Sequence, residues 1–203
     1  MSFTSVLGAW CLIVSLSFIW PQVWRIYRHD STHGLSITGN LYSLVASILW
    51  LTYGIFEHRP PIYISNISFF VAGLLICLQL SRHQKIKHLH IAATCILGIL
   101  LMLGARSISV DAVGWLAILV STFGILPQTI HVISSHSLHG ISVLSYRITL
   151  ISSISWLIFG ITVRDPIVSL PNLIIGPCVV YILIKAQKWH ASDQSVVANL
   201  ETI

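Results

Sequence analysis

Two tryptophan–asparagine pairs are the residues best suited to chemistry in this sequence. Trp50 precedes Asn66 by 16 positions, and Trp156 precedes Asn172 by the same interval. A pyranose ring stacks its C–H face on an indole and hydrogen-bonds its hydroxyls to amides, so such a set suits a ligand of this kind. A single tryptophan is better explained as an interface anchor, and a single asparagine as a helix–helix hydrogen bond. The doubled set predicts a binding site.

Small residues lie one helical turn before both tryptophans. Ala46 and Ser152 stand four positions before Trp50 and Trp156, which places them on the same helix face. We therefore predict that both residues share the site. The difference between alanine and serine is expected to tune the size of the ligand.

A Pro-Gln dipeptide also occurs twice, as Pro21-Gln22 and as Pro127-Gln128. A proline inside a helix removes one backbone hydrogen bond and permits a kink, and a neighbouring glutamine can satisfy the freed groups. Two interpretations stay open: a fixed kink that shapes packing, and a hinge that moves during function. The presence of the dipeptide at the same place in both copies favours the hinge.

These motifs belong to an internal repeat in which residues reappear 106 positions later without a gap. The matches include proline, tryptophan, glycine and asparagine, which a shared apolar composition does not explain. The identical pairs are Pro21/Pro127, Gln22/Gln128, Ser31/Ser137, His33/His139, Gly34/Gly140, Ser36/Ser142, Leu44/Leu150, Ser47/Ser153, Ile48/Ile154, Trp50/Trp156, Leu51/Leu157, Gly54/Gly160, Ile55/Ile161, Pro60/Pro166, Asn66/Asn172 and Ile76/Ile182.

The composition requires a membrane environment for the elements that carry these residues. Of the 203 residues, 55% are hydrophobic and 8% are charged, whereas a soluble domain has roughly 25% charged residues. This balance excludes an ordinary soluble domain and a disordered chain. Stretches of the length needed to span a bilayer occur at 5–27, 37–56, 62–80, 89–105, 110–133, 142–161 and 166–186. We therefore predict an all-α integral membrane protein with seven transmembrane helices.

The distribution of basic residues predicts the orientation. With the N-terminus outside, seven basic residues flank the spans on the inside and three on the outside, and the C-terminus lies inside. The inside set is Arg25, Arg28, Arg82, Lys85, Lys87, Lys185 and Lys188; the outside set is Arg59, Arg106 and Arg164.

The repeat and the number of spans together predict the domain organisation. A three-helix unit that is duplicated directly would insert its second copy upside down, and one extra span between the copies restores the direction. We predict a 3+1+3 architecture of two parallel three-helix bundles, with residues 1–81 and 110–188 as the repeats. Residues 82–109 then form a linker with the fourth helix, and 189–203 a short cytosolic tail. Carriers commonly place the substrate between such repeats.

The charged residues and histidines give weaker signals. Arg147 is the one clearly intramembrane charge, and it either snorkels to the inner interface or acts as a gate or anion contact. No Asp or Glu lies well inside a span, which favours passive transport, although Asp30 stands close to a helix end. The clusters His131/His136/His139 and His83/His88/His90 lack a completing carboxylate or cysteine. We therefore expect no metal and no cofactor. No nucleophile–base arrangement, phosphate loop or HExxH motif occurs in the sequence, so we expect no enzymatic site, and we expect no nucleic-acid partner.

Both copies resemble the SWEET and SemiSWEET sugar transporters of the PQ-loop (MtN3-saliva) superfamily. The motifs that carry the resemblance are PQVWRIYRHDSTHGLS, ILWLTYGIF and PPIYISN, followed by PQTIHVISSHSLHGIS, ISWLIFG and DPIVSLPN. The resemblance implies passive, bidirectional transport of mono- or disaccharides by alternating access. It also implies that Trp50, Asn66, Trp156 and Asn172 line the sugar pocket and that Pro21 and Pro127 serve as hinges.

Two departures keep alternatives open. The stretches 37–56 and 142–161 lack the proline that plant-type SWEETs carry there, as in the bacterial half-size forms. A Pro-Gln in both copies is also similar to lysosomal amino-acid and cystine carriers, so a proton-coupled exporter is the first alternative. A non-transporting membrane scaffold is the second. The expected location is the plasma membrane or a bacterial inner membrane, and a homo-oligomer stays open.

Overall fold

Seven helices make up the part of the chain that the structure describes. This computed structural model describes residues 2–32, 35–134 and 143–201, without the side chains of residues 127, 128, 131 and 192–201. Within these residues there is no strand. The helices are α1 (Phe3–Arg28), α2 (Ile37–Phe56), α3 (Pro60–Arg82), α4 (His88–Arg106), α5 (Val110–Ser134), α6 (Val143–Thr162) and α7 (Pro166–Glu201).

Six of these helices, all except α5, are long and apolar enough to cross a membrane. In α5 the stretch with described side chains, Val110–Leu126, is a shorter apolar helix. The prediction of an all-helical, multi-pass integral membrane protein is confirmed. The helix α7 continues to Glu201, so the residues predicted as a short tail prolong this helix up to that point.

Local sequence explains where four of the helices begin. Ser2 and Ser36 cap α1 and α2 by accepting a backbone N–H of the first turn. Pro60 and Pro166 open α3 and α7, at a position where the missing N–H of proline removes no helical hydrogen bond. Both prolines follow turns of only three residues, which bring α3 back along α2 and α7 back along α6.

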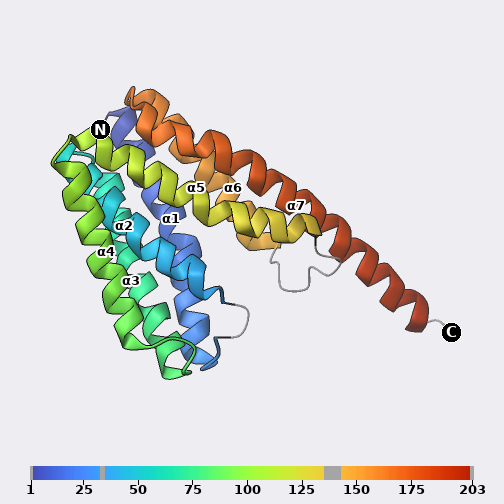
Figure 1. Ribbon diagram of the computed structural model, residues 1–203. Helices are drawn as coiled ribbons and strands as arrows, with labels where there is room; N and C mark the ends of the chain where they lie inside the picture. The colour runs from blue at the N-terminus through green and yellow to red at the C-terminus, as the bar shows by residue number, and fades with distance from the viewer. Residues whose placement is uncertain (1, 33–34, 135–142, 202–203) are drawn as a thin grey trace.

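The helices form two groups with the same internal arrangement (Figure 1). In the first half, α1–α3, the helix α3 packs against both α1 and α2. In the second half, α5–α7, the helix α7 packs against both α5 and α6. The halves meet through α1 against α6 and α2 against α5, while α4 packs on α2 and touches α3 and α5.

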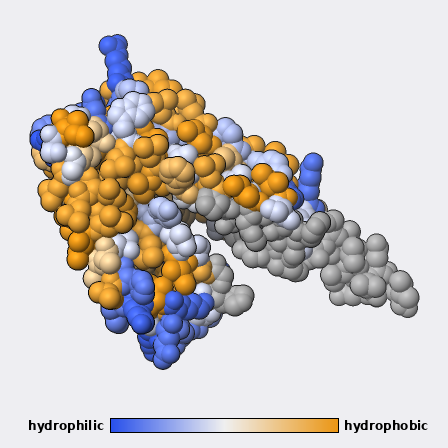
Figure 2. Space-filling model, viewed as in Figure 1, coloured by the Kyte–Doolittle hydropathy of each residue, from blue (hydrophilic) through white to orange (hydrophobic). Residues whose placement is uncertain are grey.

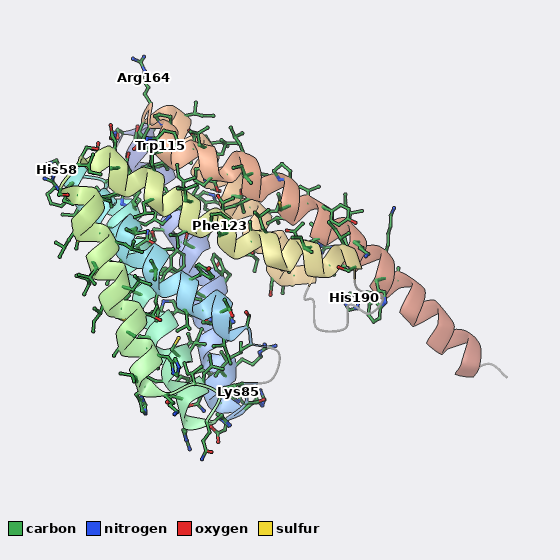
Figure 3. All side chains as sticks on the ribbon, in the orientation of Figure 1. His58, Lys85, Trp115, Phe123, Arg164 and His190 are labelled. Carbon is green, nitrogen blue, oxygen red and sulfur yellow. The ribbon has the colours of Figure 1, made fainter. Side chains whose placement is uncertain are left out.

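The two ends of the molecule differ. Near the N-terminus the halves lie together, and from there they diverge (Figure 1). We call the first the closed end; it carries the α2–α3 and α6–α7 turns. We call the other the splayed end, where Lys85 of the first half and His190 of the second lie far apart (Figure 3).

The core and the surface fit a membrane protein. At the closed end, one apolar cluster joins both halves and includes Leu49, Tyr53, Val113, Phe159 and Ile167, each at most 4% exposed. Hydrophobic side chains cover much of the visible outer face, and hydrophilic ones gather toward the ends (Figure 2). Such an apolar exterior suits contact with lipid tails, because exposing apolar side chains to water is unfavourable.

Glycines at equivalent positions allow the halves to pack closely at this end. A Cβ atom on Gly8 of α1 would lie 3.1 Å from the ring of Phe159, and one on Gly114 of α5 would lie 2.9 Å from the ring of Tyr53. Gly8 and Gly114 are 106 positions apart, and so are Tyr53 and Phe159. The same contact therefore occurs twice, once in each direction across the interface.

Candidate functional site

A cavity of about 270 Å³ lies between the two halves and is lined by residues of every helix except α4. We call it the central cavity. All six residues predicted to form the binding site line it: Trp50, Asn66, Trp156, Asn172, Ala46 and Ser152. The structure thus brings together residues that are up to 126 positions apart in the chain.

The lining of the central cavity follows the repeat almost completely. Every lining residue except Phe18 has its counterpart, 106 positions away, in the lining as well. The pairs are Ser15/Ser121, Ser43/Thr149, Ala46/Ser152, Ser47/Ser153, Trp50/Trp156, Ile62/Val168, Ser65/Pro171, Asn66/Asn172 and Phe69/Ile175. The counterpart of Phe18 is Gly124, whose position has no atom within 4 Å of an added Cβ.

The two tryptophans are fixed by hydrogen bonds that cross between the halves. Trp50 Nε1 donates to Ser121 Oγ at 2.9 Å, and Trp156 Nε1 donates to Ser15 Oγ at 3.0 Å. Each indole therefore belongs to one half and is held by the other. Because the N–H groups are already used, the indoles offer a ligand their apolar rings rather than a donor.

The two asparagines adopt the same geometry in both halves. The side-chain amide of Asn66 donates to the carbonyl of Ile62 at 2.8 Å, and that of Asn172 donates to the carbonyl of Val168 at 3.0 Å. Each bond connects an asparagine to the residue four positions earlier in its helix. It fixes the amide orientation and leaves the oxygen Oδ1 without a protein hydrogen-bond partner among the described residues. Both amides can thus accept a hydrogen bond from a ligand hydroxyl.

The polarity of the central cavity comes from hydroxyl and amide groups. Among its described lining residues there is no Asp, Glu, Lys, Arg or His. Serine and threonine hydroxyls both donate and accept hydrogen bonds, and the aromatic rings provide apolar surface. This arrangement suits a neutral ligand with several hydroxyl groups, since a charged ligand would find no counter-ion to offset its desolvation.

A buried hydrogen-bonded pair, which the sequence reasoning missed, connects the halves at the closed end. The hydroxyl of Tyr53 in α2 lies 2.9 Å from both carboxylate oxygens of Asp165, before α7. One of these oxygens also accepts the backbone N–H groups of Ile167 at 3.0 Å and Val168 at 3.3 Å. Asp165 is buried, with 6% of its surface exposed. Its carboxylate both caps α7 and binds the hydroxyl of Tyr53. Its sequence signal, an aspartate directly before the first proline of a helix, is a capping pattern.

Pro21 and Gln22 are not among the residues that line the central cavity. Pro21 lies inside α1, which stays helical on both sides of it, and Gln22 follows it there. Pro127 and Gln128 lie in α5, but their side chains are outside the described residues. The side chains of His131, His136 and His139 are outside them too. The hinge therefore remains a prediction.

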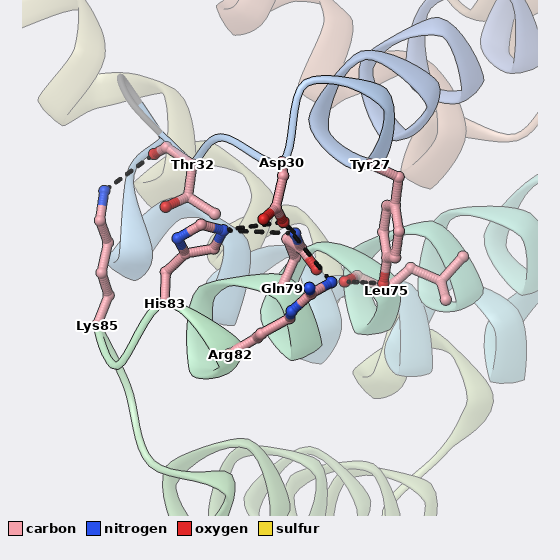
Figure 4. A network of polar contacts seen from close by, with 8 residues as sticks. All are labelled: Tyr27, Asp30, Thr32, Leu75, Gln79, Arg82, His83 and Lys85. Carbon is pink, nitrogen blue, oxygen red and sulfur yellow. Dashed lines mark hydrogen bonds and ion pairs between the residues drawn. The ribbon is translucent and has the colours of Figure 1, made fainter.

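The remaining charges lie away from the central cavity. Arg147 is exposed on α6 and is not among the lining residues. Asp30 takes part in a network at the splayed end of the first half (Figure 4). Its carboxylate accepts a hydrogen bond from Gln79 and pairs with His83 at 3.3 Å and Arg82 at 3.6 Å. This network holds the α1–α2 connection on the end of α3.

Comparison with known protein families agrees with this description. The sequence profile of the PQ loop repeat matches residues 3–63 and 110–169, which together make up more than half of the chain. The matched segments correspond to the beginnings of the two repeats. The family is therefore shown by both copies rather than by one.

Individual relatives of the chain are named as sugar transporters. The chain is 23% identical over 215 residues to "Bidirectional sugar transporter SWEET15" of Oryza sativa subsp. indica. This alignment covers 94% of this chain and 67% of that protein. It is 35% identical over 81 residues to "Sugar transporter SemiSWEET" of Escherichia coli (strain UMEA 3162-1). This alignment covers 38% of this chain and 91% of that protein. The chain thus spans about two thirds of the length of the rice relative.

The fold is also similar to a solved one. The structure described as "The 3.7 A resolution structure of a eukaryotic SWEET transporter" superposes with a TM-score of 0.76 at 18% identity. The superposition covers 93% of this chain and 97% of the other. At this identity the similarity concerns the arrangement of the helices.

Proposed function

Because the chain belongs to the PQ loop repeat family, and within it to the SWEET transporters, we propose that it is a facilitative sugar transporter. It acts as a uniporter and moves mono- or disaccharides in either direction across the membrane. The relatives are named as transporters, and the chain is not an enzyme. The observation that carries the proposal is the central cavity, to which both halves contribute a tryptophan, an asparagine and serines at equivalent positions.

The substrate pocket is the central cavity. The rings of Trp50 and Trp156 provide the apolar surfaces against which the C–H face of a sugar stacks. Asn66 and Asn172 accept hydrogen bonds from its hydroxyls through their free amide oxygens. The lack of charged side chains among the described lining residues supports a neutral sugar over a zwitterionic amino acid, which would leave two charges without partners.

We assign the topology as 3+1+3, with α1–α3 and α5–α7 as parallel bundles and α4 as the linker. The N-terminus lies outside and the C-terminus inside. The matching arrangement of α3 between α1 and α2, and of α7 between α5 and α6, supports this division. The basic residues at the ends of α1 and α3, Arg25, Arg28 and Arg82, support placing the splayed end inside.

Transport proceeds by alternating access, and the described conformation corresponds to the state open to the inside. The hydrogen bonds of Tyr53 to Asp165 and the close contacts at Gly8 and Gly114 support a closed outside. The divergence of the halves supports an open inside (Figure 1). In the opposite state the closed end would open while the splayed ends approach, with Pro21 and Pro127 as the bending points.

Uniport is favoured over proton coupling by the positions of the carboxylates. A coupling carboxylate needs to exchange protons in step with the substrate site. Asp165 is held by three hydrogen-bond donors at the closed end, and Asp30 is bound by three side chains at the splayed end. Substituting Asp30→Asn should therefore leave sugar flux in place at every pH.

Counterflow in liposomes tests the proposal. Purified protein is reconstituted with unlabelled sugar inside, and uptake of labelled glucose or sucrose is followed. The double variant Asn66→Ala/Asn172→Ala should lose uptake, because both amide acceptors are removed. The matched control is Asn40→Ala, since Asn40 lies on α2 outside the central cavity and donates to the carbonyl of Ser36.

Two results would contradict the proposal. Uptake that survives the double variant would remove the pocket assignment, and no sugar flux at any pH in the unaltered chain would remove the functional class. A non-transporting scaffold predicts the second result together with unchanged function after substitution of Trp50 or Asn172.

A further inference from the structure

A second cavity, of about 310 Å³, lies at the closed end. Along α2 the lining changes from Trp50 in the central cavity to Tyr53 and Glu57 in this one. On the other side it changes from Val168 of α7 in the central cavity to Ile167 and to Asp165, which directly precedes α7, in this one. The hydrogen-bonded layer of Tyr53 and Asp165 therefore separates the two cavities.

The second cavity is a feature of one side of the interface. Besides Tyr53, Asp165 and two arginines, its lining includes Glu57 directly after α2, and Asp111 and Trp115 on the first two turns of α5. The counterparts of these three residues are uncharged and mostly small. They are, in order, Val163, Ser5 and Ala9. Since these three counterparts carry no charge, closure of this end does not by itself require a charged residue at these positions.

The lining has the chemistry of a site for a neutral ligand rich in hydroxyl groups. The carboxylates of Glu57 and Asp111 can accept hydrogen bonds from hydroxyls, and the indole of Trp115 is 49% exposed and offers a stacking surface. Arg59 adds the opposite charge. Its Nη2 makes a hydrogen bond of 3.4 Å to the carbonyl of Val163, and its buried Nε has no partner. Mixed charge in one cavity favours a ligand that both donates and accepts over a simple cation or anion.

We propose that this second cavity is an outer binding site for the transported sugar, occupied before the sugar passes Tyr53 and Asp165. The inference rests on the proposed function and extends it to a second site on the same path. Glu57 and Asp111 bind the hydroxyls, and Trp115 contacts the apolar face of the ring. Arg164 lies at the rim, where its side chain points away from the body of the molecule (Figure 3).

The position of the site links binding to opening of the closed end. Asp165 lines the second cavity and at the same time accepts the hydroxyl of Tyr53. A sugar hydroxyl that reaches Asp165 would compete with Tyr53 for the same carboxylate. Occupancy of the outer site then favours the state in which the two halves separate there.

Protection of an introduced cysteine tests the site directly. Arg164→Cys is made in the Asn66→Ala/Asn172→Ala background, so that the central pocket no longer binds. Sealed vesicles are treated from outside with a membrane-impermeant maleimide, with and without sucrose or glucose. If the sugar is present at about twice its Kd, occupancy should slow the labelling about threefold. The parent chain, whose four cysteines are buried or half-buried, provides the background.

The repeat supplies the matched control. His58 is the counterpart of Arg164, has the same left-handed turn conformation (φ 51° against 55°) and does not line the second cavity. His58→Cys should therefore label at a rate that sugar does not change. Adding Asp111→Asn to the Arg164→Cys chain should abolish protection, whereas adding Ser5→Asn should not.

The outcomes separate this inference from the proposed function. Equal labelling of Arg164→Cys with and without sugar, or equal protection of His58→Cys, would overturn the outer site. Counterflow by the same chain without the two alanine substitutions reports on transport. Transport without protection removes the outer site alone, and protection without transport keeps the site and removes the transport proposal.

Discussion

The two halves of the molecule agree around the central cavity and differ at the closed end. Around the cavity, Trp50 and Trp156 cross the interface to Ser121 and Ser15 with hydrogen bonds of 2.9 and 3.0 Å. At the closed end Tyr53 is hydrogen-bonded to Asp165, but the equivalent pair is Phe159 and Arg59, which lacks both the hydroxyl and the carboxylate. The repeat is therefore retained almost completely around the central cavity, whereas at the closed end it keeps the glycine contacts and changes the polar pair.

If transport proceeds by alternating access as proposed, this difference determines how the closed end is released. Apolar packing of Phe159 near Gly8 closes one side, and such packing has no polar group for a substrate to compete with. The other side adds a buried polar pair, which a ligand hydroxyl or water can exchange with. A single polar connection is easier to release than two, so the asymmetry suits an end that opens in each cycle of the proposed alternating access.

The largest effect is expected from removing that polar connection. Asp165→Ala leaves the hydroxyl of Tyr53 without a partner and removes the cap of α7, which should cost about 2–4 kcal/mol of unfolding free energy. Arg59→Ala, the equivalent change in the first half, loses one long hydrogen bond and should cost about 0.5 kcal/mol. Denaturation in detergent measures both. Equal losses of unfolding free energy would show that both sides of the closed end contribute equally to stability, despite their different contacts.

The glycine contacts test the part of the closed end that both halves share. A methyl group at Gly114 would lie 2.6 Å from Ile167, and one at Gly8 would lie 2.5 Å from Pro61. Each alanine substitution should therefore destabilise the protein by about 1–3 kcal/mol. The control is Gly104→Ala on α4, which meets no atom within 4 Å and should be neutral or stabilising. A neutral Gly8→Ala would contradict the close approach of α1.

The crossed tryptophan–serine bonds should respond alike. Ser15→Ala and Ser121→Ala each free one indole N–H, at a cost of about 1 kcal/mol in sugar affinity, or roughly fivefold in Kd. Binding of labelled sugar to purified protein measures the loss. Ser17→Ala is the control, because its hydroxyl bonds to its own helix and it does not line the central cavity. Losses that differ strongly between Ser15 and Ser121 would break the two-fold equivalence of the pocket.

There is a physical reason why the helices, and the gathering of the predicted site residues around the central cavity, could be predicted from the sequence. Apolar stretches of spanning length fix the helices, and a gapless repeat places equivalent side chains around one axis. Trp50, Asn66, Ala46 and their counterparts could thus be assigned to one site. Tyr53 and Asp165 could not, because their contact crosses between the halves and the repeat changes both residues. Ser15 and Ser121 are a repeated pair as well, but a serine carries no signal until the indole that binds it is located.

The smallest and most selective effect should come from exchanging Ala46 and Ser152, which line the central cavity at equivalent positions and differ by one hydroxyl group. Ala46→Ser alone adds a hydroxyl, and Ser152→Ala alone removes one, so each should shift the ratio of glucose to sucrose counterflow by less than about threefold. The double exchange Ala46→Ser/Ser152→Ala restores the composition of the pocket but moves the hydroxyl to the opposite half. If the sugar meets both halves equivalently, the double variant should recover the original ratio, with stability unchanged by the same measurement as above. If Phe18, which has only Gly124 opposite it, fixes the sugar in one orientation, the ratio should stay shifted. The exchange therefore distinguishes a pocket that is symmetric for its ligand from one that is symmetric only in its protein atoms.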